Sequence, residues 1–408
     1  MNESITKEIV KDNFREDLSE TAVQKKRLAE PDIARFICIS MVIMQHSGLV
    51  PNTLFQFLIM FDIPLFFFLS GFVSAKSTKK QTFSAYLKEK TKRLMLPYFL
   101  FYAVDLLVYF ILQTIKKAPI DLYAIRHNLI LLFTLFGVSV VWFLSALYFS
   151  DIVTHLFLSV KKAGKIILLI LILSVFIIAR IVRTPFEDWY VQVYSINNGI
   201  VPVLPDAAYY LAGTILRIPM CVAFYATGYH IGDIMEKPRY QSMLEKWNKL
   251  SHGFRIALSL IIAWFLFVIS FYASVSNEVG NLAVYHYGNR TLLYLIAAIT
   301  GMAATMFLSH AIVLLRIKSL TFLLSYFGKN TLIILLTHLD FYILITAMRI
   351  TEHIPFIRSR LVFRLPAILF FTLFIEVPVI EIINRYFPFL IGKSGNKKKK
   401  SPSPQEKA

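Results

Sequence analysis

The sequence predicts an all-α membrane protein: a polytopic bundle of about ten membrane-spanning helices with both termini in the cytoplasm. Of its 408 residues 57% are hydrophobic, and the mean hydropathy is +0.61. These values are typical of polytopic membrane proteins and exclude a disordered chain or a soluble domain. Apolar runs of spanning length recur along the chain, and basic residues gather in alternate connections between them. By the positive-inside rule, those connections face the cytoplasm.

The apolar runs define the expected helices. In chain order they are 33–50, 55–75, 95–115, 138–159, 165–182, 208–234, 255–276, 291–315, 330–348 and 363–384. Residues 128–137 are apolar but too short to span, so they either re-enter the membrane or begin the fourth helix early. Gly213, Arg217 and Pro219 interrupt the sixth run, which predicts a broken helix there.

One membrane domain is expected, with a polar tail at each end of the chain. Residues 1–30 form a cytoplasmic tail, 31–387 the membrane domain, and 388–408 a basic, disordered cytoplasmic tail that contacts anionic lipid. The net charge of +18 is dispersed among apolar runs and tails, so we expect the lipid bilayer and no nucleic acid as its partner. Cys38 and Cys221 lie inside apolar runs with neither disulfide nor metal-ligand spacing, so no metal is expected.

One connection departs from this charge pattern. The loop before the last run faces outward in the predicted orientation, yet it is rich in arginine. Two explanations stay open: the loop contacts an anionic ligand outside, or the number of spans is off by one in the second half. The arginines are Arg349, Arg358, Arg360 and Arg364.

The first apolar run carries three ionisable side chains, Asp32, Arg35 and His46. On an α-helix Arg35 and His46 lie within roughly 20° of one stripe, Asp32 falls within about 40° of it, and Arg35 and His46 are about 16 Å apart along the axis. Ionisable groups inside a membrane are costly and usually face a protein interior or a wet cavity. We therefore expect one face of this helix to line a site that runs from Arg35 at the cytoplasmic mouth to His46 in the outer half.

His46 is the first catalytic candidate, because neutral imidazole is the natural general base near neutral pH. A packed histidine bonded to a backbone carbonyl is the structural alternative. A short connection returns Asp62 beside the first helix, where it is expected to orient His46 as the acidic partner of a His–carboxylate pair. The alternative for Asp62 is a polar residue one turn before Pro64.

Further candidates lie in the next two runs. Ser70 is a possible nucleophile, but packing is favoured because it forms a small-residue patch with Gly71 and lacks an elbow-type turn. Lys90 and Arg93 lie three residues apart on one helical face, and with Arg35 they form a basic cluster suited to phosphate groups. Ordinary loop charge is the alternative for this cluster.

Three candidates come later in the chain. Trp142 is expected to be an interfacial anchor. His338, followed by Asp340, and Glu376, near Pro378, are ionisable residues inside apolar runs and therefore site candidates by default. The sequence contains no Walker loop, no dinucleotide fingerprint and no clustered Cys/His ligand set.

These pieces, in this order, resemble the membrane-bound acyltransferase family 3, which includes the O-acetyltransferases of bacterial surface polysaccharides. They are an acidic residue, then an Arg, ten residues and a His; a Pro-Leu-Phe-Phe-x-x-Ser-Gly-Phe run; a basic-x-x-Arg pair with Pro-Tyr; Trp-Phe-Leu; Gly-x-x-Thr-Leu with a later His; and Glu-x-Pro. Their positions are Asp32, Arg35 and His46; Pro64 to Phe72; Lys90, Arg93, Pro97 and Tyr98; Trp142 to Leu144; Gly328, Thr331 and His338; and Glu376 and Pro378. The resemblance covers nearly the whole chain, from about residue 28 to residue 385.

The resemblance implies a ten-helix fold in which a cytosolic acyl-CoA, usually acetyl-CoA, is a co-substrate and no cofactor is bound. It implies that the acyl group passes to an acceptor hydroxyl, commonly on a sugar at the outer side. It also implies that His46 is catalytic and that Arg35 and Arg93 bind or gate the donor. Lys90 and Asp32 are grouped with these donor-binding residues.

The chain departs from the family pattern at two points. Many relatives of the sugar O-acetylase type have a histidine where Asp62 stands. Several larger relatives append a soluble hydrolase-like domain, whereas a short basic tail follows Arg385 here. The membrane domain, or a separate partner, is therefore expected to complete the reaction.

The sequence thus predicts an O-acetyltransferase of the cell membrane, in a bacterium, that moves an acetyl group from acetyl-CoA to a hydroxyl of a cell-surface or lipid-linked carbohydrate. His46 either deprotonates the acceptor hydroxyl or carries the acyl group itself. One rival hypothesis is a glycan exporter or proton-coupled transporter. Another is the same fold with a succinyl donor or a non-sugar acceptor. The sequence indicates neither the acceptor nor the oligomeric state.

Overall fold

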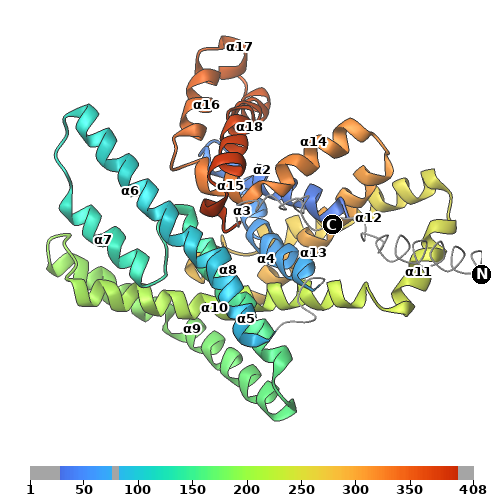
Figure 1. Cartoon of the computed structure of the whole chain (residues 1–408), viewed down its shortest axis with the longest axis horizontal. Helices are drawn as coiled ribbons and strands as arrows, with labels where there is room; N and C mark the ends of the chain where they lie inside the picture. Colours follow the sequence, from blue (N-terminus) through green and yellow to red (C-terminus); the bar gives the residue numbers. More distant parts are fainter. Residues whose placement is uncertain (1–27, 76–81, 394–408) are drawn as a thin grey trace, which may run out of the picture.

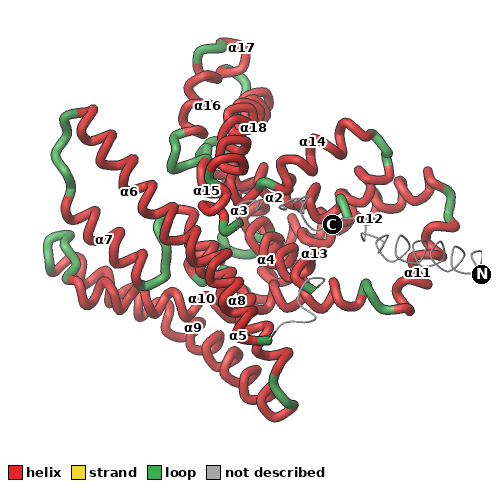
Figure 2. Tube along the Cα trace, viewed as in Figure 1, coloured by secondary structure: helices red, strands yellow, loops and turns green. Residues whose placement is uncertain are grey.

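The computed structural model describes residues 28–75 and 82–393, which form a bundle of helices with no β-strand among them (Figures 1 and 2). The predicted tails fall almost entirely outside these residues. The α-helices of the described residues are α2 (Glu30–His46), α3 (Asn52–Ile59), α4 (Asp62–Ser74), α5 (Phe83–Lys90), α6 (Leu96–Lys116), α7 (Leu122–Phe133), α8 (Trp142–Ser159), α9 (Lys162–Ile196), α10 (Val203–Ile234), α11 (Pro238–Lys249), α12 (His252–Val275), α13 (Thr291–Leu314), α14 (Lys318–Lys329), α15 (Thr331–Thr337), α16 (Ile343–Glu352), α17 (Pro355–Arg358) and α18 (Leu361–Tyr386). The predicted all-α class is confirmed.

Eight helical segments of the described chain are long and apolar enough to cross a membrane. A ninth forms when α14 and α15 are taken together as one span bent by 57°. The first helix, α2, has 17 residues and falls just short of the length that defines the other spans. The protein is therefore polytopic, as predicted.

The first helix occupies the centre of the bundle. In Figure 1, α2 lies among the central helices, and it packs against α4, α13, α14, α15 and α18. On α14, a Cβ atom at Gly328 would lie only 1.8 Å from the backbone oxygen of Asp32. Because only glycine permits this approach, α14 and α15 run directly alongside α2.

Small residues also join α4 to α10. A Cβ atom at Gly71 would lie 2.0 Å from the backbone oxygen of Tyr225, and one at Gly228 would lie 1.9 Å from that of Phe68. Small residues let membrane helices pack at close range. Gly71 of the predicted Ser70–Gly71 patch therefore takes part in close helix packing.

The structure corrects one predicted helix, 330–348. The helix α15 ends at Thr337, and the chain turns through Tyr342, whose φ of 59° is left-handed, before α16 begins. The preceding segment 318–329, interpreted from its charges as a cytoplasmic loop, is the apolar helix α14. The prediction was wrong because the flanking charges of Lys318 and Lys329 masked the apolar stretch between them.

Three other boundaries differ from the predicted ones. The short run 128–137 belongs to a separate helix, α7, followed by an irregular segment with left-handed residues at Leu135, Gly137 and Ser139. The fifth helix, α9, continues to Ile196. The sixth helix, α10, runs without a break through Gly213 and Pro219, so the predicted break was wrong. Residues 388–391 form a 3₁₀ turn with Ile391 buried, so the fold extends beyond the predicted end of the membrane domain.

Candidate active site

Two histidine side chains meet where α2 and α15 end. His46 is the last residue of α2, and His338 follows the last residue of α15. His46 Nδ1 lies 2.8 Å from His338 Nε2. The ring centroids are 5.1 Å apart and the planes differ by 14°, so the rings meet edge to edge, as an N–H···N hydrogen bond requires. Both residues are candidates from the sequence, but nothing in the sequence pairs them.

The surroundings of His338 determine which nitrogens carry protons. Its Nδ1 lies 2.8 Å from the backbone oxygen of Ile334 and 2.9 Å from that of Leu335. Carbonyl oxygens only accept hydrogen bonds, so His338 Nδ1 carries the proton, and in the neutral ring Nε2 is an acceptor. His46 Nδ1 must then donate, which leaves the lone pair of His46 Nε2 unprotonated. His338 is completely buried whereas residue His46 is exposed, so of the two rings that of His46 is the one open to a substrate.

Glu376 holds the end of α15 in place. Both of its carboxyl oxygens lie 2.9 Å from Thr337 Oγ1, and both side chains are fully buried. Thr337 directly precedes His338, so this contact ties α18 to the turn that carries His338. Glu376 is a positioning residue in this geometry, since it reaches the histidine pair only through Thr337.

A cavity of about 270 Å³ lies along the first halves of α2 and α15. We call it the basic cavity. Its charged lining residues are Arg35, Lys90, Arg93, Lys329, Lys393 and a single carboxylate, Asp151. The cavity therefore unites the three cations that the sequence grouped as a phosphate-binding cluster. Its inner wall reaches Leu335, whose carbonyl oxygen bonds His338.

Arg35 is oriented by its own helix. Its Nη1 lies 3.5 Å from Asp32 Oδ1, and its Nη2 donates to the backbone oxygen of Leu69 at 3.4 Å. Asp32 is almost fully buried and is absent from the residues that line the basic cavity. Asp32 thus supports Arg35 and does not face the cavity itself.

Lys90 forms an ion pair within the protein. Its Nζ lies 2.5 Å from Asp151 Oδ2, and the Tyr86 hydroxyl donates to the other carboxylate oxygen. The two charged side chains are only 11% and 4% exposed. The side chain of Arg93, in contrast, is 63% exposed, and its Nη1 lies as far as 3.8 Å from Glu89 Oε1. Arg35 and Arg93 are therefore better placed than Lys90 to meet an incoming phosphate.

A second cavity, of about 280 Å³, begins just after His338. We call it the acidic cavity. It lies between α6, α7 and the turn that follows α15, and its lining contains two carboxylates and no Lys, Arg or His. The lining residues are Tyr102, Asp105, Leu106, Val108, Tyr109, Leu112, Ala124, Ile125, Asn128, Leu339, Asp340 and Tyr342. The chain thus passes from the lining of the basic cavity, at Leu335, through His338 to the lining of the acidic cavity, at Leu339 and Asp340.

Two predicted site residues have local partners instead of a contact with the histidine pair. Asp62 Oδ2 accepts a hydrogen bond from Gln45 Nε2 at 2.6 Å, and its Oδ1 accepts one from the amide of Ile63. The partner of the His46 ring is His338, so the predicted His46–Asp62 pair is not formed. Ser70 lines the basic cavity, but its hydroxyl donates to the backbone oxygen of Phe66 at 2.7 Å.

Trp142 packs against a buried arginine, so it is more than an interfacial anchor. The guanidinium of Arg217 lies 5.2 Å from the Trp142 ring and 4.8 Å from the Phe136 ring. Arg217 is fully buried, and its Nη2 donates to the backbone oxygens of Leu135 and Phe136 at 2.9 and 2.8 Å. It thereby fixes the irregular segment before α8, and Ser139 of that segment donates to Asp340 at 2.9 Å.

Sequence reasoning missed several of these residues. Asp105, Asp151 and Arg217 all lie inside apolar runs, where an ionisable residue is a site candidate by default. Applying that rule to every run would have found all three. Tyr102 and Ser139 carry no comparable signal, because tyrosine and serine are common in membrane helices for packing reasons alone.

Comparison with known proteins identifies the family of the chain. The family model described as an acyltransferase domain matches residues 28–381, which contain both histidines, Arg35 and Arg93. Neither the curated proteins nor the solved structures contain a significant match. The match covers most of the chain and the helices that build the site, and it agrees with the resemblance seen in the sequence. The chain therefore belongs to acyltransferase family 3, and it is a multi-pass membrane acyltransferase.

Proposed function

We propose that this acyltransferase moves the acetyl group of cytosolic acetyl-CoA to a hydroxyl of a cell-surface or lipid-linked carbohydrate, in the plasma membrane of a bacterium. The observation that carries the proposal is the hydrogen bond between His338 and the exposed His46, from which we infer that His46 Nε2 has no proton. A neutral imidazole held in one tautomer by a second group is the arrangement of a general base.

The donor enters from the basic cavity in this proposal. Arg35 and Arg93 contact the phosphates of CoA, because a guanidinium matches phosphate oxygens in charge and geometry. The positive-inside rule assigns this side to the cytoplasm. The thioester, on its long flexible arm, then extends along α15 toward His46, past the apolar lining residues Phe143 and Leu335.

Chemistry takes place at His46. Its Nε2 removes the proton of the acceptor hydroxyl as the hydroxyl oxygen attacks the thioester carbonyl carbon. The new C–O bond forms and the C–S bond breaks. The departing CoA thiolate takes the proton back from the imidazolium, so the enzyme is regenerated and no external reductant, oxidant or metal is consumed. Direct attack by His46 on the thioester would instead give an acetyl-imidazole that the acceptor then cleaves.

Acetyl transfer can be tested with the purified full chain in lipid nanodiscs, supplied with acetyl-CoA labelled in the acetyl group. The wild type is expected to release free CoA without any ion gradient. His46→Ala is expected to slow this release by about 10²- to 10⁴-fold, the usual contribution of general base catalysis. A transporter would leave the thioester intact.

The matched control is His353→Ala. His353 is an exposed histidine at the end of α16, and its Nδ1 bonds the backbone oxygen of Arg349 at 2.8 Å. This variant is expected to retain wild-type release. Full activity in a normally helical His46→Ala protein would refute the proposed function.

A further inference from the structure

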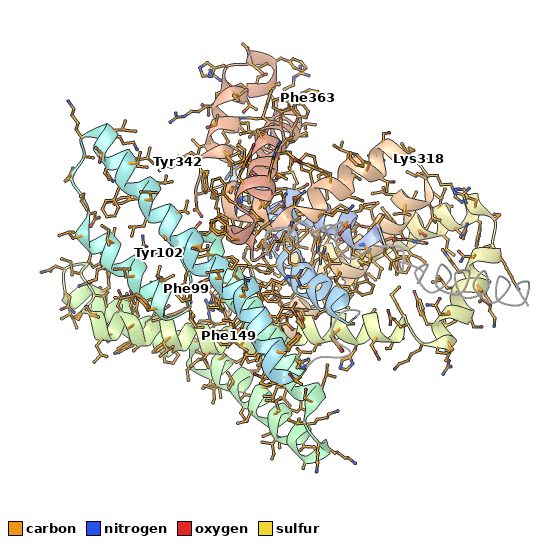
Figure 3. The ribbon with its side chains drawn as sticks, viewed as in Figure 1. Phe99, Tyr102, Phe149, Lys318, Tyr342 and Phe363 are labelled. Atoms are coloured by element: carbon orange, nitrogen blue, oxygen red, sulfur yellow. The ribbon has the colours of Figure 1, made fainter. Side chains whose placement is uncertain are left out.

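The acidic cavity has the features of a built binding site. Its volume of about 280 Å³ is close to the lower end of small-molecule pockets. The polar side chains of Tyr109, Asn128 and Asp340 converge on it from three different segments of the chain. Figure 3 shows Tyr102 on α6 and Tyr342 just before α16, at two sides of this region.

One lining hydroxyl is poised for a ligand. Tyr102 is only 5% exposed, and its hydroxyl has no hydrogen-bond partner among the described residues. A buried polar group without a partner is costly, by roughly 1–3 kcal/mol. A ligand hydroxyl in the cavity would supply the missing hydrogen bond. Tyr109 can also donate, because its oxygen already accepts from the amide of Asp121 at 3.0 Å.

The charge of the cavity defines which ligands fit. Asp105 and Asp340 both line it, and neither forms an ion pair among the residues that the structure describes. Ser139 donates to Asp340 Oδ1 at 2.9 Å and thereby fixes that carboxylate. Two unneutralised carboxylates in a half-buried site attract a cation and repel an anion.

The position of the cavity connects it to the chemistry. Leu339 and Asp340 directly follow His338, which is bonded to His46. The turn that contributes Asp340 to the cavity is therefore continuous with the residue that bonds His46. The basic cavity lies along the other end of α15, so an acceptor and a donor would approach His46 from different directions.

We propose that the acidic cavity binds the acceptor, and that the acylated hydroxyl belongs to a ring that carries an amino group. The ammonium lies between Asp105 and Asp340, and the tyrosines bond the ring hydroxyls. A neutral ring is accepted less well, and a carboxylated ring is excluded. This inference rests on the proposed function and narrows its acceptor class.

The arginines of the loop before α18 are the competing candidates, because they would favour an acidic acceptor. Arg358 and Arg360 are not among the residues that line the acidic cavity, and Arg364 is paired with Glu352 at 2.9 Å. The nearer charges, those of Asp105 and Asp340, therefore decide the selectivity.

The test compares three acceptors at equal concentration with acetyl-CoA and the full chain in nanodiscs: methyl glucosaminide, methyl glucoside and methyl glucuronide. The readout is the O-acetylated glycoside, measured by mass spectrometry. The amino glycoside is expected to react at least about tenfold faster than the neutral one, and the glucuronide slowest, because close charge pairs contribute at least that factor. In the double variant Asp105→Asn/Asp340→Asn, the amino glycoside is expected to react no faster than the neutral one.

Two controls make the comparison specific. Asp188→Asn removes an exposed carboxylate on α9 that does not line the cavity, so the order of the three acceptors should stay unchanged. Asn128→Asp adds a carboxylate to the lining and should increase the advantage of the amino glycoside.

Every outcome decides the assignment. Equal rates for the three glycosides, a preference for the glucuronide, or no effect of the Asp105/Asp340 substitutions would overturn it. The assignment would also be overturned if none of the three glycosides were acetylated while the release of CoA still depended on His46. The proposed function would stand in that case. Loss of the His46 dependence itself would refute the proposed function instead.

Discussion

The basic and acidic cavities are similar in volume but opposite in charge. The short helix α15 lines the basic cavity, and the turn that follows it lines the acidic one. The basic cavity contains five cationic side chains and one carboxylate, and that carboxylate is neutralised by Lys90. The acidic cavity contains two carboxylates and no cation. Under the proposed function this difference in charge separates the two substrates: the anionic donor binds in the basic cavity, and an acceptor that is not anionic binds in the acidic one.

The largest effect is expected when Lys90 is replaced. This change tests whether Lys90 neutralises Asp151, the only carboxylate in the lining of the basic cavity. Lys90→Met leaves Asp151 buried without its partner, and breaking such a pair typically costs about 3–5 kcal/mol. The thermal midpoint of the purified protein should therefore fall sharply. The double variant Lys90→Met/Asp151→Leu should recover most of the loss. Equal stability of Lys90→Met and wild type would show that the pair is not formed.

The second largest effect is expected when the hydrogen bond between His46 and His338 is removed. His338→Leu removes the acceptor for His46 Nδ1, so the tautomer and orientation of His46 are no longer fixed. By analogy with partners that orient metal-bound histidines, kcat should fall by about 10- to 100-fold. His338→Gln should retain more activity, because its side-chain oxygen can still accept that proton. If Leu and Gln reduce kcat equally, His338 has only a packing role.

Arg35 allows a test of whether the basic cavity binds the phosphates of the donor. Arg35→Gln should raise KM for acetyl-CoA by about tenfold or more, the value of one charge-assisted phosphate contact. The rate with acetyl-pantetheine, which lacks the nucleotide phosphates, should change little. Equal losses with both donors would mean that Arg35 supports the fold and does not bind phosphate. Arg358→Gln, outside both cavities, serves as the control.

The smallest effect is expected at Arg93. Its side chain is 63% exposed, and exposed ion pairs contribute roughly 0.2–1 kcal/mol. Arg93→Gln should therefore raise KM for acetyl-CoA by a factor of about 1.4–5, and the increase should vanish at high salt because exposed charges are screened. A loss as large as that of Arg35→Gln, insensitive to salt, would show that both arginines contact the phosphates from buried positions.

Much of the fold followed from the sequence, because membrane helices are defined by composition. The first apolar run, its ionisable face and the basic cluster required only the helical repeat and the cost of burying charge. Arg35 and His46 are both directed toward α15, as a shared stripe predicts: Arg35 shares the basic cavity with residues of α15, and His46 bonds His338 just beyond it.

The remaining features depend on contacts between distant segments. Hydropathy does not reveal that α14 and α15 form a bent span, since the polar residues Lys329, Asn330 and Thr331 divide the apolar pattern at the bend. The partner of His46 lies 292 residues away, and Asp62 is turned toward Gln45 on the first helix itself. Which intramembrane charges meet is decided by tertiary packing, and a single sequence does not encode it in any local pattern.

Site-resolved ¹⁵N NMR of histidine-labelled protein in nanodiscs would test the central claim most directly. His46 and His338 can be assigned among the nine histidines from the signals lost in His46→Gln and His338→Gln. We expect His46 to be protonated at Nδ1 and unprotonated at Nε2, with His338 also protonated at Nδ1. A proton on His46 Nε2, with Nδ1 as the acceptor, would leave no base facing the substrates and would contradict the account.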